Sequence, residues 1–165
     1  MLKAFLSHSS AQKTFVEKVA QILGQDNCFL DNKTFESGMQ TIEEIIKAIG
    51  KSSIFVFFIS KEALESQWVK DELSNVREYV DDGVIRFLPI IIDSNISHDD
   101  NRIKAWIRNE YNLQPYANPI LVARRIKEVI RELSWREFPD LQKKETLFQG
   151  RDEELSMLKR KYYDG

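Results

Sequence analysis

Trp68 and Glu72 are the residues whose types and spacing most suggest chemistry, and they lie in the stretch Ser66-Gln67-Trp68-Val69-Lys70-Asp71-Glu72-Leu73. The periodicity around them predicts a helix over 62–80, which places them one turn apart on the same face. An aromatic ring beside a carboxylate can hold a flat cationic substrate, because the ring offers stacking surface and the carboxylate offers negative charge. The pattern by itself also fits an ordinary helix, with Trp68 in the core and Glu72 as a solvated charge.

The elements that position this pair alternate between apolar strands and amphipathic helices. The sequence predicts strands at 2–7, 28–31, 54–59 and 85–92, and helices at 11–24, 41–49, 62–80, 99–109 and 118–133. The segment 113–116 fits either a short fifth strand or a loop, and Pro89 predicts an edge position for the fourth strand. This alternation predicts an α/β fold, a flavodoxin-like open parallel sheet of about five strands with helices on both faces. Ligands of such sheets bind where strands end and loops lead into helices.

Composition excludes several classes of function. The chain has 165 residues and a formal charge of −2, which gives no electrostatic reason to bind nucleic acid or an anionic membrane. Cys28 is the single cysteine and His8 and His98 are the histidines, so we expect no disulfide and no zinc site built from His and Cys. We also expect no membrane span and no signal peptide, and therefore a cytoplasmic location.

The phosphate-binding motifs of common α/β folds are missing from the loop after the first strand. That loop reads Ser7-His8-Ser9-Ser10, which contains neither the glycine pattern of a dinucleotide-binding site nor that of a P-loop. A response-regulator receiver needs an acidic pair after the first strand and a phosphate-accepting Asp after the third. Those places hold His8-Ser9 and Ser60-Lys61, so the receiver hypothesis fails.

Several motifs in order along the chain resemble a TIR domain. The resemblance covers about 1–133, and we set the domain at 1–134. It rests on Phe5-Leu6-Ser7-His8-Ser9-Ser10, Phe29-Leu30-Asp31 with Gly38 downstream, Val56-Phe57-Phe58-Ile59-Ser60, Trp68-Val69-Lys70-Asp71-Glu72-Leu73 and Phe87-Leu88-Pro89-Ile90-Ile91. In that family the first-strand motif, the loop from Asp31 to Gly38 and the helix after the third strand border one cleft.

The resemblance implies an activity. Many TIR domains cleave NAD⁺ into nicotinamide and ADP-ribose or a cyclised form, with a catalytic glutamate four residues after a tryptophan, which corresponds to Glu72 after Trp68. Nicotinamide leaves as a neutral group from a cationic substrate, so no general acid is needed, and the carboxylate stabilises the positive charge that develops on the ribose. NAD⁺ is then the substrate, with no separate cofactor or metal. The substrate contacts expected from the resemblance are Ser7, His8, Ser9, Phe35, Ser60 and Trp68.

Some of these roles have alternatives. His8 could contact the substrate phosphates or ribose, or could bond to the backbone as a loop residue. Phe35, which we expect to be exposed on a mobile polar loop, could be a substrate wall or a subunit contact. Several active relatives have basic residues just after the first strand, where this chain has Ser9 and Ser10. Phosphate contacts there have to come from hydroxyls, backbone N–H groups or another subunit.

The C-terminal residues predict a second unit. After a linker at 135–145, the segment Thr146-Leu147-Phe148-Gln149-Gly150-Arg151-Asp152-Glu153-Glu154-Leu155 resembles the entry of STAND-type nucleotide-binding ATPases. Residues 146–165 are then the truncated start of such a domain, and the chain is the N-terminal effector of an immune receptor. The alternative is a charged terminal helix.

The sequence therefore predicts a TIR NAD⁺ glycohydrolase, activated by self-assembly through TIR–TIR contacts, in antiphage or innate immune defence. The alternative is a TIR module without enzymatic activity that signals by homotypic contact. A third possibility, processing of NAD⁺ into a signalling nucleotide, shares the same site.

Overall fold

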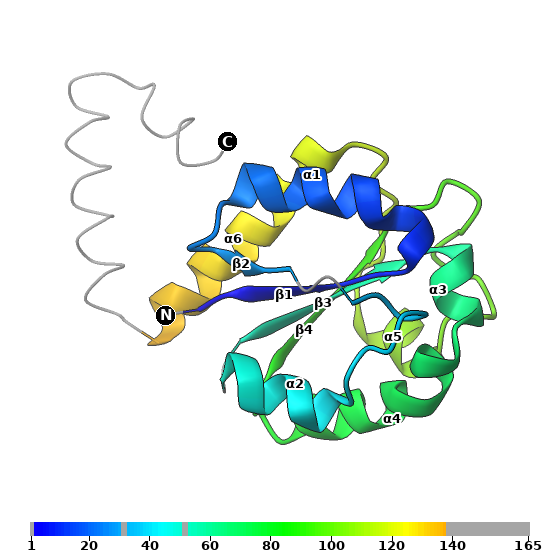
Figure 1. The fold of residues 1–165 in the computed structure, drawn as a ribbon, viewed down its shortest axis with the longest axis horizontal. Helices are drawn as coiled ribbons and strands as arrows, with labels where there is room; N and C mark the ends of the chain where they lie inside the picture. The colour runs from blue at the N-terminus through cyan, green and yellow to red at the C-terminus, as the bar shows by residue number, and fades with distance from the viewer. Residues whose placement is uncertain (1, 31–32, 51–52, 138–165) are drawn as a thin grey trace.

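A parallel sheet organises the computed structural model, which describes residues 2–30, 33–50 and 53–137 (Figure 1). Its strands are β1 (Ala4–Ser7), β2 (Cys28–Phe29), β3 (Ile54–Ile59) and β4 (Arg86–Ile91), in the order β2-β1-β3-β4. The α/β parallel architecture is confirmed, with four strands among the described residues where about five were predicted. The segment 113–116 forms an isolated bridge from Pro115 to Ile91 and no strand. β4 is an edge strand, as Pro89 predicted.

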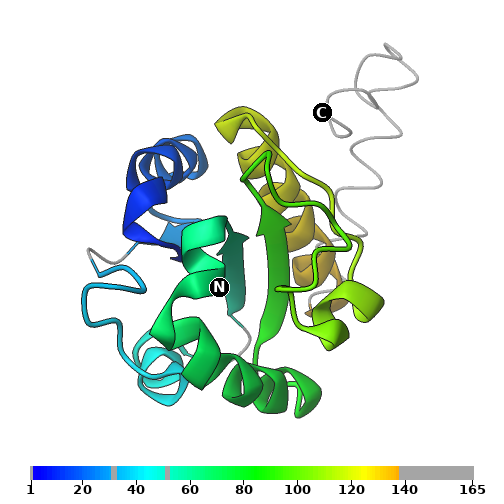
Figure 2. The same cartoon turned by 90° about the vertical axis from the view of Figure 1, so that its right-hand side faces the viewer.

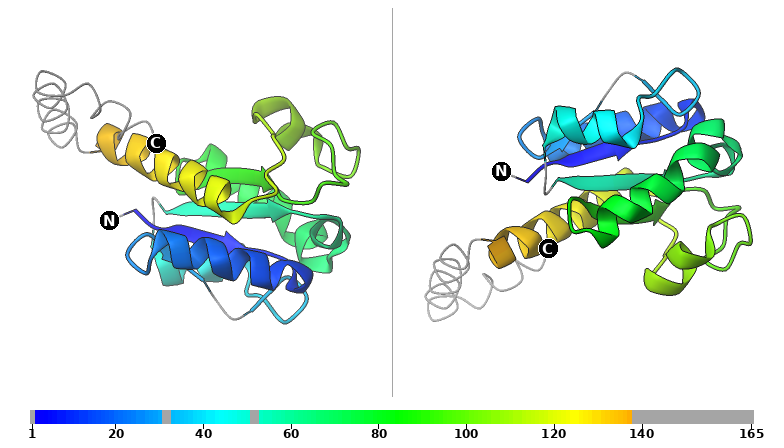
Figure 3. Two further views of the ribbon diagram at one scale, coloured as in Figure 1. Left: turned by 90° about the horizontal axis from the view of Figure 1, so that it is seen from above. Right: turned by 90° about the horizontal axis from the view of Figure 1, so that it is seen from below.

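Helices cover both faces of the sheet (Figures 2 and 3). One face carries α1 (Lys13–Leu23), which follows the short 3₁₀ helix η1 (Ser10–Gln12), and α6 (Pro119–Glu137). The other side carries α2 (Ile42–Ile49), α3 (Lys61–Glu65), α4 (Gln67–Asp81) and α5 (Ala105–Glu110).

The apolar run of β3 explains this layering. All six of its side chains are buried, and they alternate between two cores. Val56 and Phe58 pack in the core under α1 and α6, whereas Phe55 and Phe57 pack in the core that includes α2, α4 and α5. In the sheet, β2 lies on one side of β1 and β3 lies on the other, so the connections from β1 and to β3 run in opposite directions across the sheet. The point between β1 and β3 is therefore the place where a ligand is expected in a sheet of this order.

The predicted helix over 62–80 is wrong in one respect, because it is divided at Ser66. The backbone of Ser66 is extended, with φ −70° and ψ 146°. Its hydroxyl accepts a hydrogen bond from the Val69 N–H at 3.3 Å and donates one to the Ala63 carbonyl at 2.8 Å. A single buried serine thus ends α3 and begins α4, which fixes the direction in which α4 carries Trp68 and Glu72.

We expect Ser66→Ala to lower the free energy of unfolding by about 1–2 kcal/mol, because the Val69 N–H loses its side-chain cap and the Ala63 carbonyl keeps only the Ser66 N–H as a donor. Urea denaturation measures the change. Ser74→Ala, on the exposed face of the same helix, is the control and is expected to stay within about 0.5 kcal/mol of the parent. Equal stability of Ser66→Ala and the parent contradicts the capping role.

The observed elements are mostly within two residues of their predicted ends, and the two larger differences concern α5 and α6. α5 begins at Ala105 and not near 99, and α6 continues to Glu137, so the first residues of the predicted linker at 135–145 are helical. The segment 146–165, with its resemblance to a STAND entry, lies outside the described residues. Within the described ranges, none of the helices combines the length and the apolar character that crossing a bilayer requires.

Candidate active site

Ser7 and Ser60 lie at the carboxyl ends of the neighbouring strands β1 and β3, and their hydroxyls form hydrogen bonds within the domain. Ser7 Oγ donates to the Val56 carbonyl at 2.6 Å, and Ser60 Oγ accepts from the Ala63 N–H at 3.1 Å as the cap of α3. Both residues are at most 1% exposed. The structure therefore gives them a structural role, and a contact with substrate stays a prediction.

His8 is buried at the same edge, with 1% of its surface exposed. Nδ1 lies 3.2 Å from the Leu6 carbonyl, and the His8 carbonyl accepts the Phe35 N–H at 3.0 Å. Burial lowers the pKa of the imidazole, although the Leu6 carbonyl and Glu36 act in the opposite direction. A neutral ring that donates from Nδ1 has a lone pair on Nε2, and Nε2 has no hydrogen-bond partner among the described residues.

The loop before α2 is tied to the start of η1 by Glu36, which the sequence reasoning did not single out. Its carboxylate accepts the Ser9 hydroxyl at 2.8 Å and the Ser10 backbone N–H at 2.7 Å. Partial burial acts to raise the pKa of Glu36, but these hydrogen bonds outweigh burial, so the pKa lies below its ordinary value. An internal anion thus occupies the donors that the sequence analysis assigned to substrate phosphate.

This lowered pKa predicts acid-dependent stability. Unfolded Glu36 has its ordinary pKa of about 4.5, above the folded pKa. Its contribution to stability is therefore complete above about pH 4.5 and is lost as the pH falls through the folded pKa. Because Glu36 is exposed, we expect Glu36→Gln to cost only about 0.5–1 kcal/mol at pH 7. Urea denaturation at pH 7 and pH 3.5 should show this difference shrinking at the lower pH. Glu132→Gln, exposed on α6, serves as the control, and a difference independent of pH contradicts the assignment.

Phe35 and Trp68 are buried against each other, so the exposure expected for Phe35 is wrong. Phe35 is 5% and Trp68 is 8% exposed, and their rings stack with centroids 5.2 Å apart. Trp68 also stacks on Phe55 at 6.0 Å, and its indole N–H donates to the Gln40 carbonyl at 2.8 Å. Trp68 is therefore a core residue, which is one of the two alternatives that the sequence left open. Its indole N–H also holds the loop that precedes α2.

Glu72 lies one turn further along α4 and is only half-buried. Its Oε2 accepts a hydrogen bond from Asn75 Nδ2 at 3.1 Å and a long one from the Ile42 N–H at 3.5 Å. Because Ile42 begins α2, the carboxylate lies at the positive end of that helix dipole.

A cavity of about 250 Å³ opens beside this carboxylate, between α2 and α4. It is lined by Thr41, Ile42, Glu43, Glu72, Asn75, Glu78 and Tyr79. Its three carboxylates favour a cation and disfavour a diphosphate. In the part of the chain that the structure describes, no three His, Cys, Asp or Glu side chains lie so that they could hold a metal ion together. Of the residues predicted to form the site, Glu72 alone lines this cavity.

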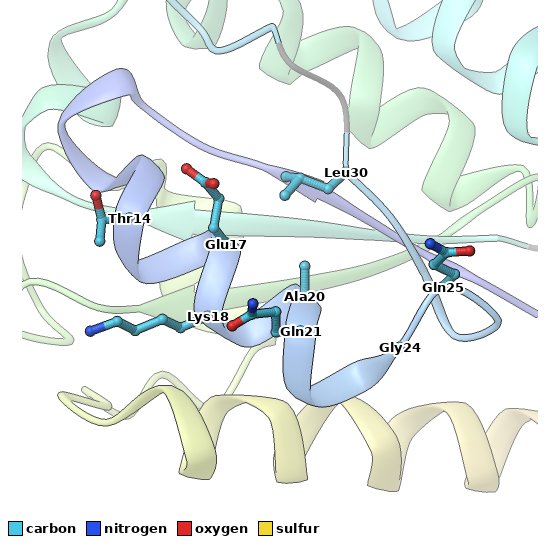
Figure 4. A pocket seen from close by; sticks show the side chains of 8 residues that line it. All are labelled: Thr14, Glu17, Lys18, Ala20, Gln21, Gly24, Gln25 and Leu30. Atoms are coloured by element: carbon cyan, nitrogen blue, oxygen red, sulfur yellow. The ribbon is translucent and has the colours of Figure 1, made fainter.

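A larger hollow of about 660 Å³ lies along α1 (Figure 4). Its lining comes from α1 and the following segment up to Leu30, and its charged side chains are Glu17 and Lys18, of opposite sign. None of the residues predicted to bind substrate lines it. We therefore place the candidate active site at Glu72 and not in this hollow.

The sequence reasoning missed Glu36, Asn75 and Gln40. The signal for Asn75 was present, because a residue three positions after Glu72 on a helix lies next to it. Glu36 and Gln40 act through a carboxylate on a loop and a backbone carbonyl, and no local pattern indicates their distant partners.

Comparison with known proteins identifies the family. The family model for the TIR domain matches residues 4–117, from β1 through the Pro115 bridge. The chain belongs to the TIR domain family. No curated protein matched the chain. TIR domains serve signalling and immune-type functions and associate through TIR–TIR contacts, and the family includes members that cleave NAD⁺.

Proposed function

We propose that this TIR domain cleaves the bond between nicotinamide and ribose in NAD⁺, with Glu72 as the catalytic carboxylate. The observation that carries the proposal is the carboxylate itself, which is half-buried, held by two donors and open to a cavity. A carboxylate fixed in this way can stabilise positive charge as it develops on the ribose. Nicotinamide leaves with the electron pair of the broken bond, and water then adds to the ribose and loses a proton to give ADP-ribose, or an internal nucleophile of the same molecule adds to give the cyclic form.

The size and charge of the cavity support binding of the cationic end of NAD⁺. A volume of about 250 Å³ is small compared with the ~300–1,000 Å³ of typical ligand pockets. The nicotinamide and its ribose can enter between α2 and α4, while the acidic lining directs the diphosphate outward. The rest of the dinucleotide then lies on the surface or against a second TIR domain, which is why we propose that self-assembly activates the enzyme.

Substrate contacts by Trp68 and Ser9 require movement of the loop at 33–41. Phe35 covers the face of Trp68, and Glu36 occupies the Ser9 and Ser10 donors. A shift of this loop uncovers both groups together. We propose that assembly favours that shift and that the domain works as an effector in antiphage or innate immune defence. The proposal extends to a STAND ATPase further along the same chain.

A second candidate function is an interaction module that signals by homotypic contact without cleaving NAD⁺. The exposed apolar side chains favour it, because Ile22 of α1 and Leu121 and Ile120 of α6 are 39%, 42% and 56% exposed. α1 and α6 lie on the same face of the sheet (Figure 3). Apolar groups exposed on neighbouring helices can form a contact between copies.

The test is release of nicotinamide from NAD⁺ by the full chain at high protein concentration, with assembly followed by light scattering. We expect release to rise more steeply than in proportion to protein concentration as the chain assembles. Chromatography of the products distinguishes ADP-ribose from a cyclic product. An assembled protein that releases no nicotinamide overturns the enzymatic proposal and favours the interaction module.

A further inference from the structure

We propose that Asn75 is a positioning residue for Glu72, an inference that rests on the proposed cleavage of NAD⁺. Asn75 Nδ2 donates to Glu72 Oε2 at 3.1 Å, and both residues line the same cavity. The second donor to Oε2 is the Ile42 N–H at 3.5 Å. Both hydrogen bonds end on one oxygen, and Oε1 accepts none from the described residues. Glu72 is thus anchored through Oε2, with Oε1 available to the ribose.

Anchoring matters because a glutamate side chain has several rotatable bonds. Without a partner, a half-buried glutamate samples several rotamers, and ordering it during the reaction costs side-chain entropy. A hydrogen bond to an ionised oxygen is stronger than one between neutral groups, so the Asn75 amide restricts Glu72 before substrate arrives. Geometry fixed in advance contributes directly to rate, since small misplacements of a reacting group are costly.

The hydrogen bonds that Asn75 and Ile42 donate to Glu72 differ in how far they depend on the packing of other elements. Asn75 follows Glu72 by three residues on α4, so helix geometry alone brings the two side chains together. Ile42 begins α2, directly after the loop that Phe35, Glu36 and Gln40 tie down. Any shift of that loop moves the weaker donor, whereas Asn75 stays with Glu72. We infer that Asn75 holds the carboxylate while the loop is open.

Two substitutions by residues of similar size distinguish a positioning role of Asn75 from a purely structural role. Asn75→Leu removes the donor, and Asn75→Asp removes it and adds a like charge. Asn75 is exposed on α4, so both variants are expected to fold, with unfolding free energies that urea denaturation compares with the parent. Ser74→Asp adds a carboxylate at the neighbouring exposed position and is the matched control for charge.

We expect Asn75→Leu to lower kcat by about 10-fold with KM within about twofold, because the substrate is bound but the carboxylate is poorly placed. Asn75→Asp is expected to lose about 100-fold at pH 7.5 and to recover toward the parent near pH 5. A carboxylate pair shares one proton at low pH, and this restores a donor to Glu72. Ser74→Asp is expected to follow the pH profile of the parent.

The hydrogen bond also has a readout independent of catalysis. The side-chain amide resonance of Asn75 is expected to shift in Glu72→Gln and to stay in place in Glu132→Gln, whose site is exposed on α6 on the other face of the sheet. An unchanged kcat in Asn75→Leu, a pH profile of Asn75→Asp that matches Ser74→Asp, or an unshifted amide overturns the positioning role. If the assembled parent releases no nicotinamide, the proposed function fails and this inference fails with it. Release by the parent with full activity in Asn75→Leu overturns this inference alone.

Discussion

Replacing Glu72 by glutamine is expected to lower nicotinamide release from NAD⁺ by about 100–1,000-fold, the usual effect of removing a group that stabilises transition-state charge. Glutamine keeps the length of the side chain and an oxygen that accepts the Asn75 and Ile42 donors. Its neutral amide cannot stabilise positive charge on the ribose. The loss should therefore fall on kcat, with little change in the fold.

The matched control is Asp71→Asn, which removes the adjacent carboxylate of α4. Asp71 is exposed, accepts a hydrogen bond from Gln67 at 2.8 Å and does not line the cavity beside Glu72. We expect this variant to retain parental activity. Denaturation curves and light scattering compare stability and assembly for both variants. Full activity in Glu72→Gln would falsify the mechanism, whatever the control shows.

Trp68→Ala is expected to have the largest effect on stability, about 3–5 kcal/mol, because it opens a cavity beside Phe35 and Phe55 and leaves the Gln40 carbonyl without its donor. A domain of ordinary stability has about 5–15 kcal/mol in total, so little remains. Urea denaturation followed by circular dichroism measures the loss. Trp68→Phe keeps most of the ring surface, and we expect it to cost less than Trp68→Ala.

Trp106→Ala provides the comparison. Trp106 is only partly buried, where it packs on Phe87 with centroids 5.2 Å apart, so its removal should cost less than that of Trp68. A stability of Trp68→Ala close to that of the parent contradicts its place in the core. If the expected loss is found, reduced activity in Trp68→Ala reports on folding as well as on chemistry. Glu72 is therefore the position at which the mechanism should be tested.

The order of the elements could be predicted because local signals marked their ends. Continuous apolar residues predicted β3 over Ile54–Ile59, the range observed. Gly24 and Gly50 end α1 and α2 with φ near 84° and 86°, a backbone conformation that glycine adopts without strain. The break at Ser66 was missed because serine fits a helix interior as well as a cap, and the apolar pattern continues through it.

The exposure of Phe35 could not be read from its neighbours. Polar residues surround it in the sequence and predicted a solvated loop, but the loop folds back onto β1 and α4 through long-range bonds. Glu36 and Gln40 supply those bonds, and their partners are distant in sequence. Backbone carbonyls carry no sequence signal, so the burial of this loop is decided by packing.

The sequence by itself determined the α/β parallel sheet, the TIR family and the placement of Trp68 and Glu72 on one face of a helix. Only the tertiary structure decided what covers that face. Phe35 and Phe55 enclose the ring of Trp68, whereas the carboxylate of Glu72 meets Asn75 and the start of α2 beside a cavity. The helical period fixes which residues are neighbours on one element, but the packing of other elements sets whether each neighbour meets a core or an opening.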